Sequence, residues 1–293
     1  MEFRRFNLDS INTLRPYFAD NQYRLCDYTL GGVFIWRDHH ETEYAIENGE
    51  LYLKVGSPEI VFIPPQSSEP NRSSLEQIIS YCAARGIPAR LGAVPEPLVQ
   101  GILELFPGSK AATDRDWSDY LYLSGDIASL AGRKYSGQRN HINRFMRDYL
   151  TWSFERITEN NAPEVKEFVI KHAEEHIKDS PAYIEGNIKT LEVLDNLDAY
   201  GLFGGALYVD GAVIGASFGE TVGDTMFVHT EKADTAYHGS YPMLVNQFAG
   251  MFVSGGAKYI NREEDDGIEG LRTSKLSYHP IALLQKYVVE LKY

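Results

Sequence analysis

The 293-residue sequence has only two cysteines, Cys26 and Cys82, and it has no long apolar run. Two cysteines are too few for a disulfide framework or for a four-cysteine zinc site. No window approaches the roughly 18 consecutive apolar residues that a membrane-spanning helix needs. The N-terminal stretch "MEFRRFNLDS" is too polar for a signal peptide. We therefore expect a reduced, soluble, cytoplasmic protein without integral membrane contact.

Basic residues are also scarce, with 28 Lys and Arg against 41 Asp and Glu, which gives a formal net charge of −13. A body this acidic repels nucleic acid and anionic lipid, so a polyanion would have to be bound by a local basic patch. The 43% hydrophobic and 12% aromatic content is typical of a globular protein. The length suits two domains of about 150 residues.

Two β-hairpins divide the chain into halves. Their turns are Asn48-Gly49 and Asp210-Gly211, two pairs that tolerate the positive φ angles of a tight hairpin. Each hairpin is preceded by a helix and followed by a third strand, a helix, a short strand, a helical stretch and a Tyr-rich strand. This order occurs twice, offset by about 165 residues, which indicates duplication.

The repeat predicts an α/β (α+β) protein with two tandem domains, each a mixed, mostly antiparallel sheet flanked by helices. We place an N-terminal domain at 1–130, a basic junction segment and helix at 131–150, and a C-terminal domain at 151–293. Helical spacing of apolar residues supports a helix in the later part of the junction.

The order of elements resembles the GNAT acyltransferase fold, in which the sheet splays between its fourth and fifth strands. The resemblance implies a donor in the splay, with phosphates near the N-terminus of the following helix, where backbone N–H groups and the helix dipole favour an anion. In the second half this place falls on Gly239 and Ser240. The loop has fewer glycines than the usual pyrophosphate loop of that superfamily.

The junction holds the only strongly basic run of the chain, within "GRKYSGQRNHINRFMRD". Lys134, Arg139 and Asn140 precede the settled part of the helix, so they are candidates for phosphate contacts. The alternative is a solvated helix face with its partners elsewhere.

Three short motifs suggest metal or hydrolase chemistry and are better explained otherwise. The segment 172–176, "HAEEH", matches a zinc motif but lacks an evident third ligand. The segment 215–219, "GASFG", matches a nucleophile elbow but lies inside an expected strand. A calcium loop starting at Arg262 would end at Thr273, and both residue types are wrong for calcium. We expect no metal site.

Charged residues gather at two strand ends of the second half. His229 and Glu231 share one face of the expected fourth strand, and Lys232 takes the other. The candidate catalytic residues are Glu263, Glu264 and His229, which could take a proton from an acceptor. The candidate substrate-binding residues could hold phosphates or a developing oxyanion: Lys134, Arg139, Asn140, Glu231, Lys232, Gly239, Ser240, Asn261, Arg262, Arg272 and Lys275. The alternative is strand-end polarity and helix capping.

Three segments, "GRKYSGQRNHINRF", "HTEKA…HGSYPMLVNQFA" and "YINREEDDGIEGLRTSKLSYHP", resemble in order and spacing the family of the phosphatidylglycerol lysyltransferase C-terminal domain. That family is related to the Fem-type aminoacyltransferases. The resemblance implies an acyl- or aminoacyl-transferase with aminoacyl-tRNA or an acyl-CoA as co-substrate, tRNA at the basic junction, and an acceptor amine or hydroxyl not yet identified. The alternative is a non-catalytic binding or sensor protein that holds a small anionic metabolite in the C-terminal domain.

Overall fold

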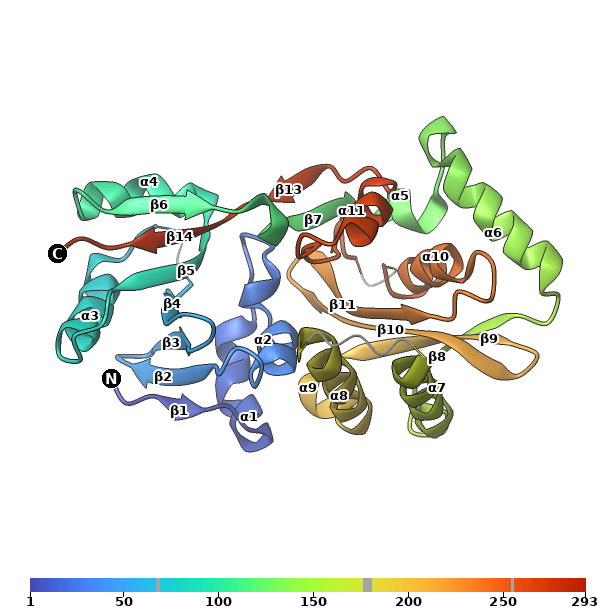
Figure 1. Ribbon diagram of the computed structural model, residues 1–293, viewed down its shortest axis with the longest axis horizontal. Coiled ribbons are helices and arrows are strands. Elements are labelled where there is room, and N and C mark those ends of the chain that lie inside the picture. The colour runs from blue at the N-terminus through green and yellow to red at the C-terminus, as the bar shows by residue number, and fades with distance from the viewer. Residues whose placement is uncertain (67–68, 176–180, 254–255) are drawn as a thin grey trace. The chain divides into compact units, whose positions relative to one another are not determined.

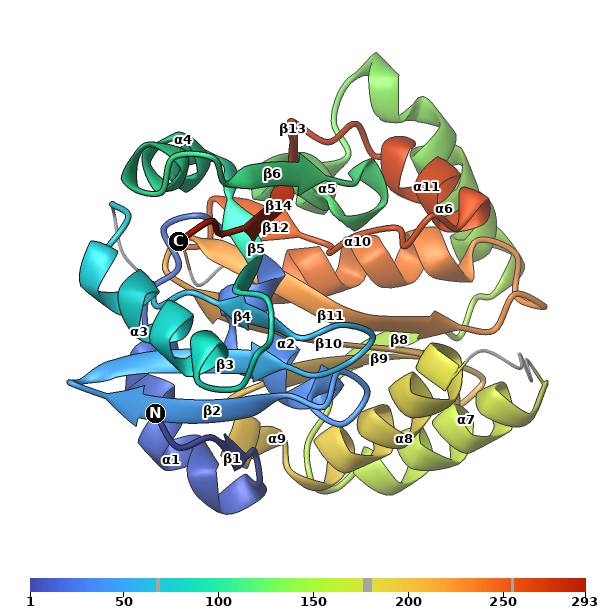
Figure 2. The same cartoon turned by 60° about the vertical axis from the view of Figure 1, so that its left-hand side comes forward.

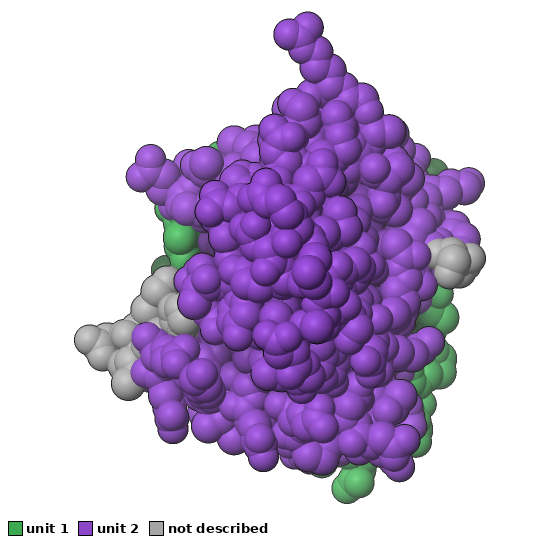
Figure 3. Space-filling model, turned by 90° about the vertical axis from the view of Figure 1, so that its right-hand side faces the viewer, with its two compact units in different colours: residues 1–119, 264–268, 283–293 green, residues 120–263, 269–282 purple. Residues whose placement is uncertain are grey.

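The computed structural model describes residues 1–66, 69–175, 181–253 and 256–293 (Figure 1). It divides into two compact units, which Figure 3 colours separately. Unit 1 comprises residues 1–119, 264–268 and 283–293, and unit 2 comprises residues 120–263 and 269–282. Across the described ranges, no helix is long and apolar enough to cross a membrane.

The sheet of unit 1 has the strand order β1-β2-β3-β4-β5-β14-β6. The β2–β3 turn is Asn48-Gly49, both at positive φ as predicted, and β4 and β5 are parallel. The strands are β1 (Arg4–Arg5), β2 (Glu43–Glu47), β3 (Glu50–Val55), β4 (Val61–Ile63), β5 (Arg90–Pro95), β6 (Lys110–Thr113) and β14 (Lys286–Glu290). The helices are η1 (Leu8–Ser10), α1 (Ile11–Leu14), η2 (Arg15–Phe18), η3 (Cys26–Tyr28), α2 (Leu30–Trp36), α3 (Arg72–Ala83), α4 (Glu96–Leu105) and η4 (Arg115–Trp117).

The second sheet has the order β13-β7-β12-β11-β10-β9-β8. Helix α10 packs on one face of its strands and α7 on the other (Figure 2). The strands are β7 (Asp119–Leu123), β8 (Ser153–Arg156), β9 (Phe203–Val209), β10 (Ala212–Val222), β11 (Thr225–Ala233), β12 (Tyr259–Asn261) and β13 (Ala282–Leu284). The helices are α5 (Ser124–Ser129), η5 (Arg133–Tyr135), α6 (Ser136–Asp148), α7 (Ala162–Glu175), α8 (Pro181–Asp195), α9 (Leu197–Tyr200), α10 (Ser240–Phe252) and α11 (Glu269–Leu276).

The two sheets share one plan, which confirms the predicted α/β tandem architecture. Read from β1 and from β8, both run through an antiparallel meander to a parallel pair, β4–β5 in one and β11–β12 in the other. The next strand in each sheet comes from the other half of the sequence. Strand β14 lies beside β5 in the first sheet, and β7 lies beside β12 in the second. The compact units are therefore not contiguous in sequence. The ranges 1–130, 131–150 and 151–293 remain a prediction for the duplicated halves.

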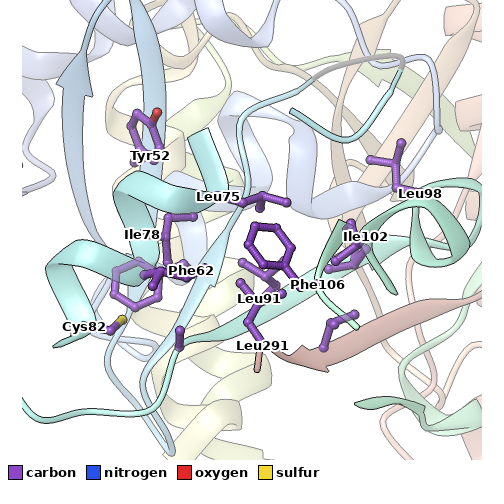
Figure 4. Close-up of a cluster of buried hydrophobic side chains, with 14 residues drawn as sticks. Tyr52, Phe62, Leu75, Ile78, Cys82, Leu91, Leu98, Ile102, Phe106 and Leu291 are labelled. Carbon is purple, nitrogen blue, oxygen red and sulfur yellow. The ribbon is translucent and has the colours of Figure 1, made fainter. Parts of the chain in front are cut away.

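The core of unit 1 is built where α3 and α4 pack on the strands (Figure 4). Apolar residues of α3 recur at helical spacing, and Leu75, Ile78 and Cys82 are all buried. They meet Phe62 of β4, which is fully buried. Asn71 begins α3 by accepting hydrogen bonds from the backbone N–H groups of the first turn.

Replacing Phe62 with Ala should lower the free energy of unfolding by about 3–5 kcal/mol, because the site is closed on all sides and a cavity would remain. The matched control is Ile60→Ala on the same segment, whose side chain is 38% exposed. It should change stability by less than about 0.5 kcal/mol. Urea denaturation followed by circular dichroism measures both. Equal losses for the two variants would contradict the assignment of this core.

Candidate functional site

Strands β11 and β12 separate after a short stretch of pairing. They are hydrogen-bonded in parallel from Thr225↔Tyr259 to Phe227↔Asn261. Strand β11 then continues along β10 as far as Ala233. The chain after β12 instead follows β7, where the Tyr120 N–H donates to the Glu263 carbonyl at 3.1 Å. The splay predicted from the sequence is therefore present, and the side chains that follow Phe227 and Asn261 face one another across it.

His229 is the first bridge across this divergence. Its Nδ1 lies 2.7 Å from Glu263 Oε1, and its Nε2 lies 2.9 Å from Glu220 Oε1 on β10. Burial alone would lower the pKa of His229, but hydrogen bonds and charge from both carboxylates raise it to about 10. The ring is thus an imidazolium at neutral pH and donates on both sides. It can orient Glu263, but it has no lone pair with which to accept a proton.

Glu220 was not identified from the sequence. The available signal in the sequence was one acidic residue within the mostly apolar and small residues of the strand Ala212–Val222, because a carboxylate is rarely buried without a partner.

Arg262 forms the second bridge. Its Nε and Nη2 lie 3.2 Å and 2.6 Å from Glu231 Oε2 on β11. The guanidinium carbon lies 4.8 Å from the centre of the Tyr278 ring and 5.9 Å from that of Tyr122, within the range of cation–π attraction. Arg262 is only 5% exposed, and in the described part of the chain its Nη1 has no hydrogen-bond partner. Lys275 donates to the Arg262 carbonyl at 2.6 Å.

The turn after β12 fixes the direction of Glu263. The Asn261 side chain is fully buried, and its Oδ1 accepts the Glu263 N–H at 2.6 Å. Glu263 itself has a φ of 56°, in the left-handed region that non-glycine residues seldom occupy. Such strain persists where surrounding contacts over-determine it, and it often marks functional positions.

Lys232 points to the other face of β11, as strand alternation predicts. Its Nζ donates to Asn187 Oδ1 on α8 at 2.7 Å. Burial lowers its pKa to about 8. Lys232 therefore lies on the side of the sheet opposite to His229 and Glu231.

The start of α10, where Gly239 and Ser240 were expected to hold phosphates, is closely packed. A side chain at Gly239 would come within 2.6 Å of the His141 carbonyl on α6. The Ser240 N–H donates to Tyr237 O at 3.0 Å, and Ser240 Oγ donates to Asp234 O at 2.8 Å. The helix contains Pro242 in its first turn, which has no N–H. Few free N–H groups remain for an anion here.

Glu264 belongs to unit 1, apart from the other candidates. Its Oε2 lies 3.0 Å from Lys286 Nζ, which also lies 2.8 Å from Asp27 Oδ2, 2.7 Å from Asp119 Oδ1 and 3.2 Å from Cys26 Sγ. Cys26, Asp119 and Glu264 are close enough together to hold a metal ion, but the ammonium group of Lys286 already contacts all three. Glu264 thus balances the charge of a buried lysine.

Two of the basic side chains of the junction have contacts within the junction region itself. Lys134 pairs with Asp126 at 3.0 Å, and Arg139 donates to the carbonyls of Leu130 and Gly132. Helix α6 begins at Ser136, so Arg139 and Asn140 lie within the helix and not ahead of it as expected, and Asn140 is exposed. On α11, Arg272 is half-buried.

The described residues of the zinc-like and elbow-like motifs are buried and make packing or hydrogen-bond contacts within the fold. His172 is buried on α7 with its ring 5.7 Å from that of Phe168, and His176 lies outside the described residues. Ser217 lies within β10 and donates to Thr230 O at 2.9 Å, so the elbow geometry is absent at this serine.

The pairing of His229 predicts a pH dependence. A pKa raised in the folded state stabilises the protein fully below the unfolded value of about 6.5, and this contribution is lost as pH rises through about 10. We expect the imidazole NMR signals of His229 to stay constant between about pH 6 and pH 9. In His229→Gln, the decline in unfolding free energy over the alkaline range should be smaller. A titration of His229 near pH 6.5 would contradict the pairing.

Comparisons with known proteins place these observations in a family. Residues 18–290 match the model of "Phosphatidylglycerol lysyltransferase, C-terminal". A conserved protein of unknown function from Bacteroides thetaiotaomicron VPI-5482 is 29% identical, with 100% of both chains covered and a TM-score of 0.91. L-PGS from Bacillus licheniformis shares the fold, with 11% identity, 97% of this chain and 91% of that chain covered, and a TM-score of 0.64.

A curated relative is an uncharacterized protein of Mycoplasmoides gallisepticum, 26% identical over 175 residues. The match covers 59% of this chain and 56% of the length of that protein. Since the family model covers nearly the whole sequence, this chain belongs to the phosphatidylglycerol lysyltransferase C-terminal family.

Proposed function

We propose that this protein transfers an acyl group, and specifically an aminoacyl group, to an acceptor amine or hydroxyl at the divergence of β11 and β12. The observation that carries the proposal is the buried Arg262 guanidinium. It retains an Nη1 without a partner among the described residues, and it adjoins Glu263 in sequence. A buried donor left unpaired costs about 1–3 kcal/mol, so its retention points to a ligand oxygen.

The residues suggest a division of labour for this reaction. The acceptor nitrogen or oxygen attacks the ester carbonyl of the donor, and Glu263, held by the imidazolium of His229, takes the proton that the acceptor loses. Arg262 Nη1 supports the negative charge that develops on the carbonyl oxygen. The ester C–O bond then breaks, the leaving oxygen takes up a proton, and the new amide or ester is released.

The start of α10 favours an aminoacyl-tRNA donor over an acyl-CoA. A CoA pyrophosphate needs free N–H groups at a helix N-terminus. Here the His141 carbonyl lies beside Gly239, and Pro242 supplies no N–H. On α6, the side chains of Arg144 and Arg147 are 52% and 71% exposed, although both contact Asp148. The phosphates of a tRNA backbone would compete with the Asp148 carboxylate for these two guanidinium groups.

Binding measurements distinguish the donors. We expect charged tRNA to bind more weakly as salt rises, because phosphate contacts release counterions, and acyl-CoAs not to bind. Arg144→Ala combined with Arg147→Ala should weaken tRNA binding about tenfold or more, whereas the control Arg85→Ala, on an exposed position of unit 1, should not. Fluorescence anisotropy measures the affinity for both charged tRNA and acyl-CoA. Tight acyl-CoA binding without tRNA binding would reverse the choice of donor.

Substitutions at the divergence test the chemistry. Glu263→Gln should lower turnover by about 10²–10⁴-fold, because the base is lost while the shape is kept. Arg262→Lys should lower it by about 10²–10³-fold, since an ammonium group lacks the planar fork. The matched control is Glu269→Gln, on an exposed position of α11. The rate of each variant is measured by single-turnover transfer of a radiolabelled aminoacyl group. Full activity in Glu263→Gln would exclude this residue as the base.

A second function is favoured by the same buried guanidinium. A sensor protein would use Arg262 and Lys275 to hold a small anionic metabolite without turnover. This alternative predicts a ligand retained through purification and seen by mass spectrometry of the denatured protein, together with no product from any donor. The transferase predicts product and no tightly retained ligand.

A further inference from the structure

Glu220 is a buried acidic residue that takes no part in the transfer steps proposed above. It lies near the end of β10, and its Oε1 is 2.9 Å from His229 Nε2. The other ring nitrogen of His229, Nδ1, lies 2.7 Å from Glu263 Oε1. The three side chains, all in unit 2, therefore form a chain in which two carboxylates share one imidazolium.

The two ends of this chain differ in their access to solvent. The His229 side chain is fully buried, and the side chain of Glu220 is 8% exposed, against 15% for Glu263. Glu220 is held within a paired strand, opposite Phe227 of β11, whereas Glu263 lies in the turn after β12, next to Arg262. A substrate can therefore reach the chain at Glu263, and Glu220 is its closed end.

Strand separation alone does not require such a chain. In unit 1 the topologically equivalent strands β4 and β5 pair in parallel only at Phe62↔Leu91. Pro64 and Pro65 follow, and the divergence adjoins a cavity of about 250 Å³ whose walls are mainly aromatic and aliphatic side chains. Because burial of a charge is costly unless the charge is matched, a second carboxylate beside His229 points to a role beyond closing the sheet.

The proposed transfer gives the second carboxylate such a role. When Glu263 takes the proton of the acceptor, it becomes a neutral carboxylic acid and no longer balances the charge of His229. A buried imidazolium left without an anion would oppose this proton transfer. Glu220 remains hydrogen-bonded to Nε2, so the cation keeps an anion both before and after the proton moves.

We propose that Glu220 is a positioning residue of the transfer reaction, the permanent counter-ion of His229 that allows Glu263 to gain and lose a proton. Glu220 acts through His229 and does not touch the substrate. The inference rests on the proposed function for the origin of the proton, whereas the pairing can be tested without turnover.

Nuclear magnetic resonance of the His229 imidazole tests the pairing in the full chain, with Glu263→Gln as a neutral mimic of the protonated Glu263. In this variant we expect His229 to remain an imidazolium at about pH 7, because Glu220 still balances its charge. In the double variant Glu220→Gln with Glu263→Gln the ring should be neutral at this pH, because burial then lowers its pKa below the ordinary value of about 6.5. A neutral His229 in Glu263→Gln alone would overturn the inference, and this result does not depend on the folding of the double variant.

Turnover separates a positioning role from a purely structural one. Glu220→Gln should lower kcat at least about tenfold with KM little changed, since the missing anion matters only once Glu263 is protonated. Glu220→Asp, which keeps the charge, should recover part of the loss. The matched control is Glu192→Gln on α8, whose side chain is 21% exposed and pairs with Lys189 at 2.9 Å. This control should leave kcat and the His229 signals unchanged.

Two further outcomes are decisive. A wild-type kcat in Glu220→Gln would overturn the inference. An inactive wild-type chain, together with an imidazolium at His229 in Glu263→Gln, would instead refute the proposed transfer and leave the counter-ion assignment of Glu220 standing.

Discussion

The arrangement of unit 2 depends on one constraint: two parallel strands that stop pairing while both remain in the interior. Once β11 and β12 part after Phe227 and Asn261, the separation must be closed by side chains. Two charge-assisted pairs do so, His229 with Glu263 and Arg262 with Glu231. Buried charges of this kind are tolerated only when each is matched. Removing Arg262 would leave the Glu231 carboxylate without its cation, whereas His229 keeps a second carboxylate, Glu220, if Glu263 is removed.

The same constraint explains why consecutive residues in the chain have unlike surroundings. Glu263, in unit 2, contacts His229, while Glu264, in unit 1, contacts Lys286. In unit 1, burial and neighbouring carboxylates raise the pKa of Asp119 to about 7, while Lys286 opposes the rise. An acid run that reads in the sequence as one charged patch is thus divided between two clusters, each of which balances its own cation.

Much of the fold followed from local chemistry. The Asn48-Gly49 and Asp210-Gly211 turns require positive φ, and the structure has both hairpins. The splay and the separation of His229 from Lys232 followed from strand order and alternation. The exchange of β7 and β14 could not be predicted, because both Tyr-rich strands fit either sheet equally well by pattern. Nor could Glu220 or Lys286, whose partners lie 9 and 22 or more residues away in the chain and are chosen by tertiary packing.

The two divergences show what duplication leaves free to change. Topology obliges β4 and β5, like β11 and β12, to separate at the same place, but it does not specify what fills the space. In unit 2 the filling is ionic and tightly paired, which suits a site where charge develops during a reaction. In unit 1, Pro64-Pro65 and aromatic side chains line an open cavity beside the divergence. A paired ionic arrangement resists movement because each charge needs its partner, whereas the walls of the unit 1 cavity are mainly aromatic and aliphatic side chains. The duplicated plan therefore gives two chemically different environments from one backbone rule.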